Sequence, residues 1–206
     1  WTFHAQTLGL ALVATGLLMR LPYFASGPLF EDDHFRYLLD GAVLASGSSP
    51  YRYAPADLLA RPELVSPGLV EQGRNLISQI NFPDLRTIYP GTAQLLFAIS
   101  HLSAPWSLNG LRTVAFLSEA LTAILMWHLA VTERGSPWRV AVVWCNPLLA
   151  FTLTGQAHID AVIMPLLLGA VIAARRQAGG LAGLAIGLAA GVKLWPILVV
   201  PVFARA

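Results

Sequence analysis

Long apolar runs, each bounded by charged or turn-forming residues, constrain this chain more than any other feature. They cover roughly residues 5–24, 110–131, 138–154, 161–174 and 179–203. A helix needs about 20 mainly apolar residues to cross a bilayer, and several of these runs are apolar all round. Only 12% of the residues are charged, against about 25% in soluble domains. We expect an all-α integral membrane protein, residues 1–206 forming one membrane domain with about five transmembrane helices.

A long polar segment, residues 25–109, separates the first two expected spans. Within it, residues 34–46 read as an amphipathic helix, because Phe35, Leu38, Leu39 and Val43 recur at spacings of three and four. The run 91–103 is apolar but too short to span, and we expect a juxtamembrane or re-entrant helix there.

The basic residues predict which segments share a side of the membrane. The short loops 133–139 and 175–177 hold tight basic clusters, and such loops are typically cytoplasmic. With both inside, the segment 25–109, the turn 155–160 and the Lys193 end of the last run face outward. A true span at 91–103 would reverse the side of every later segment relative to residues 25–88, and we favour the re-entrant interpretation.

This topology brings titratable residues that are far apart in sequence to one membrane face. They are Asp32, Asp33, His158, Asp160 and Lys193. Convergence of such groups at one face is what a polar site in a membrane protein needs.

The acidic run Glu31, Asp32 and Asp33 stands just before the amphipathic helix. Carboxylates stabilise a helix N-terminus, which is one interpretation. The other is that one of them is a general base, which takes a proton from an acceptor hydroxyl as its oxygen attacks a sugar carbon.

The start of this helix carries mixed polar chemistry on one face. Asp33, Arg36, Tyr37 and Asp40 stand at helical spacings of three and four. A carboxylate, a guanidinium and a phenol together suit a sugar phosphate. They suit a solvated ion-pair cluster equally well.

Two later segments hold further candidates. His158 lies near Gln156 and Asp160, either as a hydrogen-bonded structural group or as part of a site. Lys193 stands about 20 Å into the last apolar run by helical rise, and Pro196 follows it. A lysine there either lines a polar cavity at a helix break or marks the helix end, with its amine reaching the headgroups.

Glycines recur every four residues at positions 179, 183, 187 and 191. Small residues at this spacing let membrane helices pack closely, so we expect a partner helix on the stripe Gly179/Gly183/Gly187/Gly191, in this chain or another. Other partners are the membrane lipids. We find no basic stripe with interleaved aromatics and expect no nucleic acid, and no clustered histidines or cysteines predict a metal.

Several motifs in order then carry a resemblance. They occupy residues 32–41, 50–55, 81–90, 144–148, 155–161 and 191–196. Together they resemble bacterial GT-C membrane glycosyltransferases, most of all the polyprenyl-phosphate-mannose-dependent mannosyltransferases, over their N-terminal half. The resemblance places the chain in a bacterial inner membrane with its long loop in the periplasm.

The resemblance implies an inverting transfer of a hexose such as mannose from a polyprenyl-phosphate donor, with no cofactor required. Asp33 matches the catalytic acid of the family's first loop, with Asp32 as the fallback. Arg36, His158 and Lys193 would hold the donor phosphate. Tyr37, Gln156 and Asp160 would be further substrate-binding or orienting residues.

Two departures keep alternatives open. Tyr89-Pro90-Gly91 stands where the family usually has Tyr-Pro-Pro, and family members are roughly twice as long as this chain. A truncated, non-catalytic GT-C-like subunit of a larger membrane complex is therefore the competing function. A transporter would use the broken helix and the membrane lysine, although we find no internal repeat.

Overall fold

The computed structural model describes residues 3–136 and 138–203, and all regular structure in these two ranges is helical. The helices are α1 (Phe3–Arg20), α2 (Asp33–Ala45), α3 (Pro55–Ala60), α4 (Leu69–Ile77), α5 (Gly91–Ser103), α6 (Leu108–Thr132), α7 (Trp138–Trp144), α8 (Pro147–Leu149), α9 (Ile163–Arg175), α10 (Gly179–Ala190) and α11 (Val200–Phe203). Shorter 3-10 helices are η1 (Leu21–Ala25), η2 (Pro62–Leu64), η4 (Ile159–Val162) and η5 (Trp195–Val199), and η3 (Ala150–Gly155) is π-helical. The all-helical expectation is confirmed.

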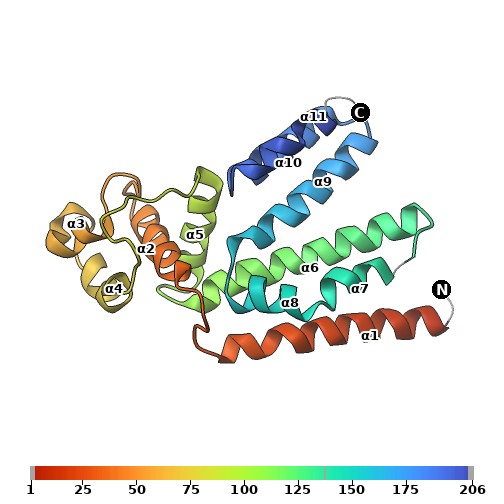
Figure 1. Ribbon diagram of the computed structural model, residues 1–206, viewed down its shortest axis with the longest axis horizontal. Coiled ribbons are helices and arrows are strands. Elements are labelled where there is room, and N and C mark those ends of the chain that lie inside the picture. The colour runs from red at the N-terminus through yellow and green to blue at the C-terminus, as the bar shows by residue number, and fades with distance from the viewer. Residues whose placement is uncertain (1–2, 137, 204–206) are drawn as a thin grey trace.

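The molecule has two parts (Figure 1). The bundle consists of α1 and α6–α11, whose longer helices extend away from the lobe. The lobe consists of α2–α5, and it caps one end of the bundle. Near the junction of the two parts, the side-chain amide of Asn109 in α6 donates to the Phe24 carbonyl of η1 at 3.0 Å.

Among the described residues, two helices are long and apolar enough to cross a bilayer, Thr7–Ala25 and Leu108–Thr132. A third crossing results if Trp138–Gly155 and Ile159–Arg175, which meet at 115°, count as one broken span. The structure thus has two to three candidate spans by length and composition, and the expected count of five is not shown. The turn expected at 155–160 is present, because residues 156–158 separate η3 from η4.

The expected span 179–203 is corrected to a hairpin. Helix α10 ends at Ala190, and the segment from Trp195 to Phe203 turns back beside it. Val199 and Phe203 pack against the small cluster of Ala182 and Ile186. Pro196 has no N–H to continue the helical hydrogen bonding, so a straight helix cannot pass through it.

The lobe is built around the contact of α2 with α5. Leu39, Val43 and Ile77 are buried in its own hydrophobic cluster, together with residues of α3 and α4. At the α2–α5 crossing a side chain on Gly41 would collide with the Phe97 backbone, so glycine is needed for this close approach. The amphipathic helix predicted at 34–46 is α2, and the short helix predicted at 91–103 is α5.

The two basic loops lie at the same end of the bundle, away from the lobe (Figure 1). Arg175 forms an ion pair with Glu133 there, joining one loop to the other. The turns at 156–158 and 191–194 lie at the opposite end, beside the lobe. The relative placement inferred from the positive charges is therefore the one observed.

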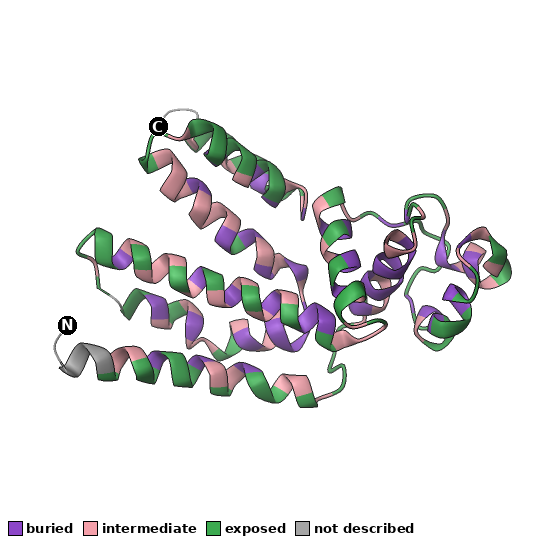
Figure 2. Cartoon of the chain, turned by 180° about the vertical axis from the view of Figure 1, so that it is seen from behind, coloured by how far each residue is buried: buried purple, intermediate pink, exposed green. Residues whose placement is uncertain are grey.

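Exposed residues recur along the helices of the bundle (Figure 2), and many of them are leucines and isoleucines. Leu117, Leu121 and Ile124 of α6 and Leu181 and Leu184 of α10 are all exposed. Apolar side chains that face outward along bundle helices are typical of a lipid-facing surface, because a soluble protein rarely exposes large contiguous apolar patches. The chain is a membrane protein.

Candidate functional site at the lobe end of the bundle

Asp33 lies in the first turn of α2 and receives two phenol hydroxyls. Tyr37, one helical turn further on, donates to Asp33 Oδ2 at 3.3 Å, and Tyr89 donates to the same oxygen at 3.3 Å. Asp33 itself is exposed, whereas Tyr37 is only 1% exposed and stacks on Phe97. The carboxylate is thus accessible but oriented by groups that are held in the core.

Both tyrosines remain protonated at neutral pH. Burial is the largest cause that raises the pKa of Tyr37 far above its ordinary value, and burial also raises the pKa of Tyr89 to about 12. A protonated phenol is a donor, so at neutral pH each of the two tyrosines can donate a hydrogen bond to Asp33.

A pocket of about 190 Å³ opens beside Asp33, between the start of α2 and the loop 80–89. Asp32 lines it and accepts a hydrogen bond from the Asn81 side chain. Arg36 also lines it, but its guanidinium donates to loop carbonyls, at 2.9 Å to Leu85 and 3.2 Å to Phe82. In this structure Arg36 holds the loop, and its expected role on a donor phosphate stays a prediction.

A second polar cluster comes from the turns at the ends of η3 and α10. Lys193 Nζ lies 2.6 Å from Asp160 Oδ2, and His158 Nδ1 lies 3.8 Å from the same oxygen. All three side chains are partly exposed. Gln156 is buried and its Oε1 accepts from the Phe30 backbone N–H at 3.5 Å.

The two clusters meet through one hydrophobic core. Tyr37, whose hydroxyl is on Asp33, packs in a buried cluster with Ala157, Ile159 and Val192, the neighbours of the second set. The turn after α10 is also tied to the lobe by a hydrogen bond from Ala93 N to Gly191 O at 3.0 Å. The predicted residues therefore gather at the lobe end of the bundle, from segments separated by up to 161 positions in sequence.

Asp40 departs from the sequence expectation. The sequence spacing groups it with Asp33, Arg36 and Tyr37 on one polar helix face, yet it is 3% exposed and accepts from Gln94 Nε2 at 2.9 Å. Gln94 also donates to Thr87 Oγ1 at 3.1 Å. Burial raises the pKa of Asp40 to about 6. The α5 helix covers this part of α2, which a helical wheel alone does not reveal.

Sequence reasoning missed three charged residues inside the bundle. Arg20 and Glu119 form a buried pair, with Nη2 to Oε1 at 2.5 Å, and Thr154 of the π-helix donates to the other Glu119 oxygen at 2.5 Å. Arg112 is fully buried among backbone carbonyls. A signal was present, since Arg112 and Glu119 lie inside an apolar run, where ionisable groups pair or mark function.

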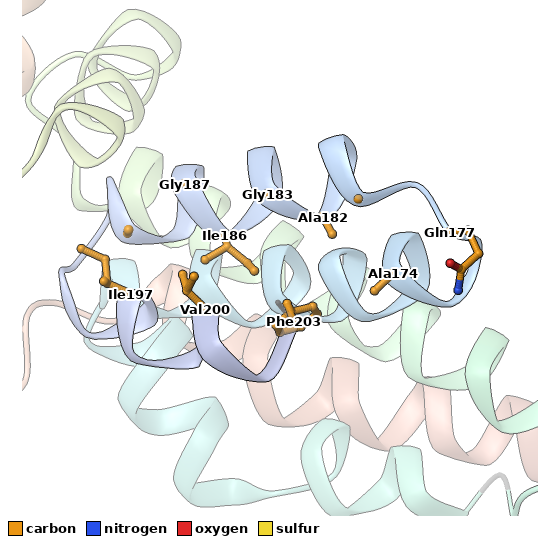
Figure 3. Close-up of a pocket in the computed structure, with 11 residues that line it drawn as sticks. Ala174, Gln177, Ala182, Gly183, Ile186, Gly187, Ile197, Val200 and Phe203 are labelled. Atoms are coloured by element: carbon orange, nitrogen blue, oxygen red, sulfur yellow. The ribbon is translucent and has the colours of Figure 1, made fainter. Parts of the chain in front are cut away.

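The glycine stripe divides in two. A side chain on Gly191 would collide with Thr92 of α5, so that glycine serves a contact within the chain. At Gly179, Gly183 and Gly187 nothing lies within 4 Å of an added Cβ. Gly179, Gly183 and Gly187 line a groove of about 550 Å³ between α9, α10 and the returning segment (Figure 3). The partner helix expected there stays a prediction.

Fold and site together define a helical membrane protein with a carboxylate-centred polar site at one end of its bundle. The chain belongs to the MptA_B family: the family model described as alpha-(1->6)-mannopyranosyltransferase, N-terminal domain, matches residues 3–206. The family indicates mannosyltransferase activity, and the mannosyltransferase part of the resemblance is confirmed. No curated protein and no solved structure matches the chain.

Proposed function

We propose that this chain transfers a mannosyl group from a polyprenyl-phosphate donor to an acceptor hydroxyl at the outer face of a bacterial inner membrane. Asp33 takes the proton of the acceptor hydroxyl, whose oxygen forms a bond to the anomeric carbon of the mannose. The bond from that carbon to the phosphate oxygen breaks, and the electron pair leaves with the polyprenyl phosphate. A single displacement inverts the anomeric carbon, so the α-product named by the family requires a β-linked donor.

The leaving phosphate needs positive charge, and Lys193 and His158 are the side chains proposed to supply it. In the free protein Asp160 Oδ2 lies 2.6 Å from Lys193 Nζ, which keeps the amine oriented until a phosphate arrives. Tyr37 and Tyr89 orient Asp33, and Gln156 supports the turn that carries His158. In this proposal the positive charge near the leaving phosphate comes from the side chains of Lys193 and His158.

One observation carries the proposal: an exposed carboxylate with two tyrosine donors lies at the same end of the bundle as a lysine–aspartate–histidine cluster. General base and phosphate site must be neighbours for an in-line displacement. The proposed base and the phosphate-binding residues come from three separate segments. These are α2, the turn after η3 and the turn after α10, which folding brings to one end of the bundle.

The test is Asp33→Asn, assayed for transfer of mannose from a polyprenyl-phosphate-mannose donor with purified protein in lipid. The substitution keeps the size of the side chain and removes the proton acceptor, so transfer should fall by about 10²–10⁴-fold. Glu63→Gln is the matched control, because it removes one exposed carboxylate from the same lobe, and it should keep full activity. Equal activity of Asp33→Asn and wild type would refute the proposed role.

The competing function, a non-catalytic subunit of a larger membrane complex, is favoured by one observation. Gly183 and Gly187 face open space along a groove of about 550 Å³, which suits the close approach of another helix. Purification from the native membrane distinguishes the two. Fixed partner chains together with no transfer by the purified assembly would favour the subunit function.

A further inference from the structure

Arg112 is a buried cation whose described hydrogen-bond partners include no carboxylate. It is 0% exposed, and it stands in the first turns of α6, where the helix dipole disfavours a positive charge. Burial of an ion is costly unless it is well compensated. A cation placed at such a cost must contribute something specific to this position.

The compensation comes from backbone carbonyls of two different segments. Toward the first, Nη1 donates to the carbonyl of Ser26 at 2.7 Å and also to that of Tyr23, and Nη2 donates to Gly27 at 2.9 Å. Toward the second, Nε and Nη2 both donate to the Gly155 carbonyl, at 3.2 and 3.0 Å. The planar, forked guanidinium is suited to hold several acceptors at fixed angles.

These two segments lead directly into the two halves of the proposed site. The segment 23–27 continues into Asp33 at the start of α2. Gly155 is followed by Gln156 and then by the turn with His158 and Asp160. A second link between the segments, Phe30 N to Gln156 Oε1 at 3.5 Å, lies beyond the Arg112 contacts.

We propose that Arg112 is a positioning residue, which fixes the distance between the Asp33 segment and the turn with His158 and Asp160. This inference rests on the proposed function and adds to it. Because Arg112 is 0% exposed, its loss should misalign the base and the phosphate site rather than remove a binding contact. A misplacement of about 1 Å at a reacting centre can cost about 100-fold in rate.

The first experiment compares Arg112→Lys and Arg112→Gln with wild type. Lysine keeps the charge without the fork, and glutamine removes the charge. Both should fold and show kcat lower by about 100-fold with the donor KM little changed, the pattern of an interaction that matters only in the transition state. Guanidinium ion added to Arg112→Ala should restore part of kcat. A folded Arg112→Lys with wild-type kcat would overturn the inference.

A second experiment leaves Arg112 intact. A side chain on Gly155 would meet the ring of Tyr23 at 3.2–3.3 Å, so Gly155→Ala pushes the two segments apart by a few tenths of an ångström. Its kcat should fall, and Tyr23→Leu added to Gly155→Ala should recover it by removing the ring. Failure of the double variant to recover activity, with both proteins folded, would contradict positioning by this contact.

A readout without substrate separates this inference from the proposed function. Amide hydrogen exchange in residues 23–30 and 155–160 should rise together in Arg112→Gln, while exchange in α4 stays as in wild type. Unchanged exchange in both segments would overturn the positioning role of Arg112, even if transfer activity is present. Increased exchange in Arg112→Gln would support the positioning role of Arg112. If the wild type at the same time transfers no mannose from the polyprenyl donor, the proposed function is rejected while the positioning role stands.

Discussion

Lys193 and Asp160 join the end of α10 to the turn before α9 through an ion pair of 2.6 Å. The pair explains how a lysine is accommodated far inside an apolar run: the helix ends before it, and a carboxylate meets the amine. Both side chains remain partly exposed, at 39% and 30%. The amine is therefore available to a second anion that approaches from outside.

Replacing Lys193 with Met should weaken the use of the donor. The leaving phosphate loses a positive neighbour, and loss of one such stabilising group costs about 10²–10³-fold in rate. The measurement is kcat/KM for the polyprenyl-phosphate donor. Lys193→Arg keeps the charge and should retain much of the activity. Wild-type kcat/KM in Lys193→Met would remove this lysine from the site.

Removing the Tyr89 hydroxyl should disturb Asp33 without disturbing the fold. Tyr89→Phe deletes a hydrogen bond to a carboxylate, which is worth about 1.5–3 kcal/mol, so transfer should fall by roughly 10- to 100-fold. Tyr51→Phe is the matched control. Its hydroxyl donates at 2.8 Å to the Tyr89 carbonyl and not to Asp33, so it should stay close to wild type. Equal losses in both variants would argue against a role of the Tyr89 hydroxyl on Asp33.

Stability should depend on pH through Asp40. Burial raises the pKa of this carboxyl from 3.8 to about 6, so between pH 4 and 6 the folded state binds a proton that the unfolded state has released. The free energy of unfolding should therefore fall as pH rises through this window and level off above pH 6. A difference of about two pKa units corresponds to on the order of 3 kcal/mol.

Asp40→Asn should abolish this dependence, because asparagine does not titrate and its carbonyl oxygen can still accept from Gln94. The check is thermal unfolding in detergent at several pH values from 4.5 to 7.5, for wild type and variant side by side. The same slope in both proteins would show that another group is responsible.

The buried pair inside the bundle should be sensitive to loss of one partner. Glu119→Gln leaves Arg20 buried without its counter-charge, and such a change typically costs 3–5 kcal/mol. The double variant Arg20→Met with Glu119→Leu should be more stable than Glu119→Gln, because no unpaired charge remains. Unfolding temperatures of the three proteins test this order. A double variant less stable than Glu119→Gln would show that the ion pair itself is required.

The glycines of α10 should differ in their tolerance of a methyl group. Gly191→Ala should lower the unfolding temperature, because the added carbon collides with Thr92. Gly183→Ala should leave it unchanged, because open space lies there. If the purified chain carries a partner helix on this groove, Gly183→Ile should release it. A destabilised Gly183→Ala in the isolated chain would contradict the described packing.

The sequence predicts which end of the bundle each polar segment occupies, but it does not predict which helices contact each other. Apolar runs and basic loops placed Asp33, His158, Asp160 and Lys193 at one end, because charge asymmetry and span length act locally along the chain. The turn after Gly155 is expected from the sequence. The reversal after Ala190 is not, since hydropathy measures how apolar a segment is and not whether the chain turns back.

Long-range partners of charged residues were the other gap. Asp40 was placed on a polar face because α5, which covers it, is more than 50 positions away in sequence. Among the described residues, Arg112 donates to backbone carbonyls and not to carboxylates. An arginine inside an apolar run signals a buried charge. Because every residue has a backbone carbonyl, residue type and spacing do not show which ones Arg112 bonds.

The contacts of Asn109 and Arg112 imply an order of assembly during synthesis. Residues 23–27, which lead into the lobe, are made directly after α1, yet both side chains that hold their carbonyls belong to α6, which the ribosome makes later. Lys193 arrives later still and docks on Asp160 only when α10 has turned back toward the lobe. A nascent chain therefore carries Asp33 long before the Lys193–Asp160 pair exists, and the two halves of the proposed site come together only when the membrane bundle is in place.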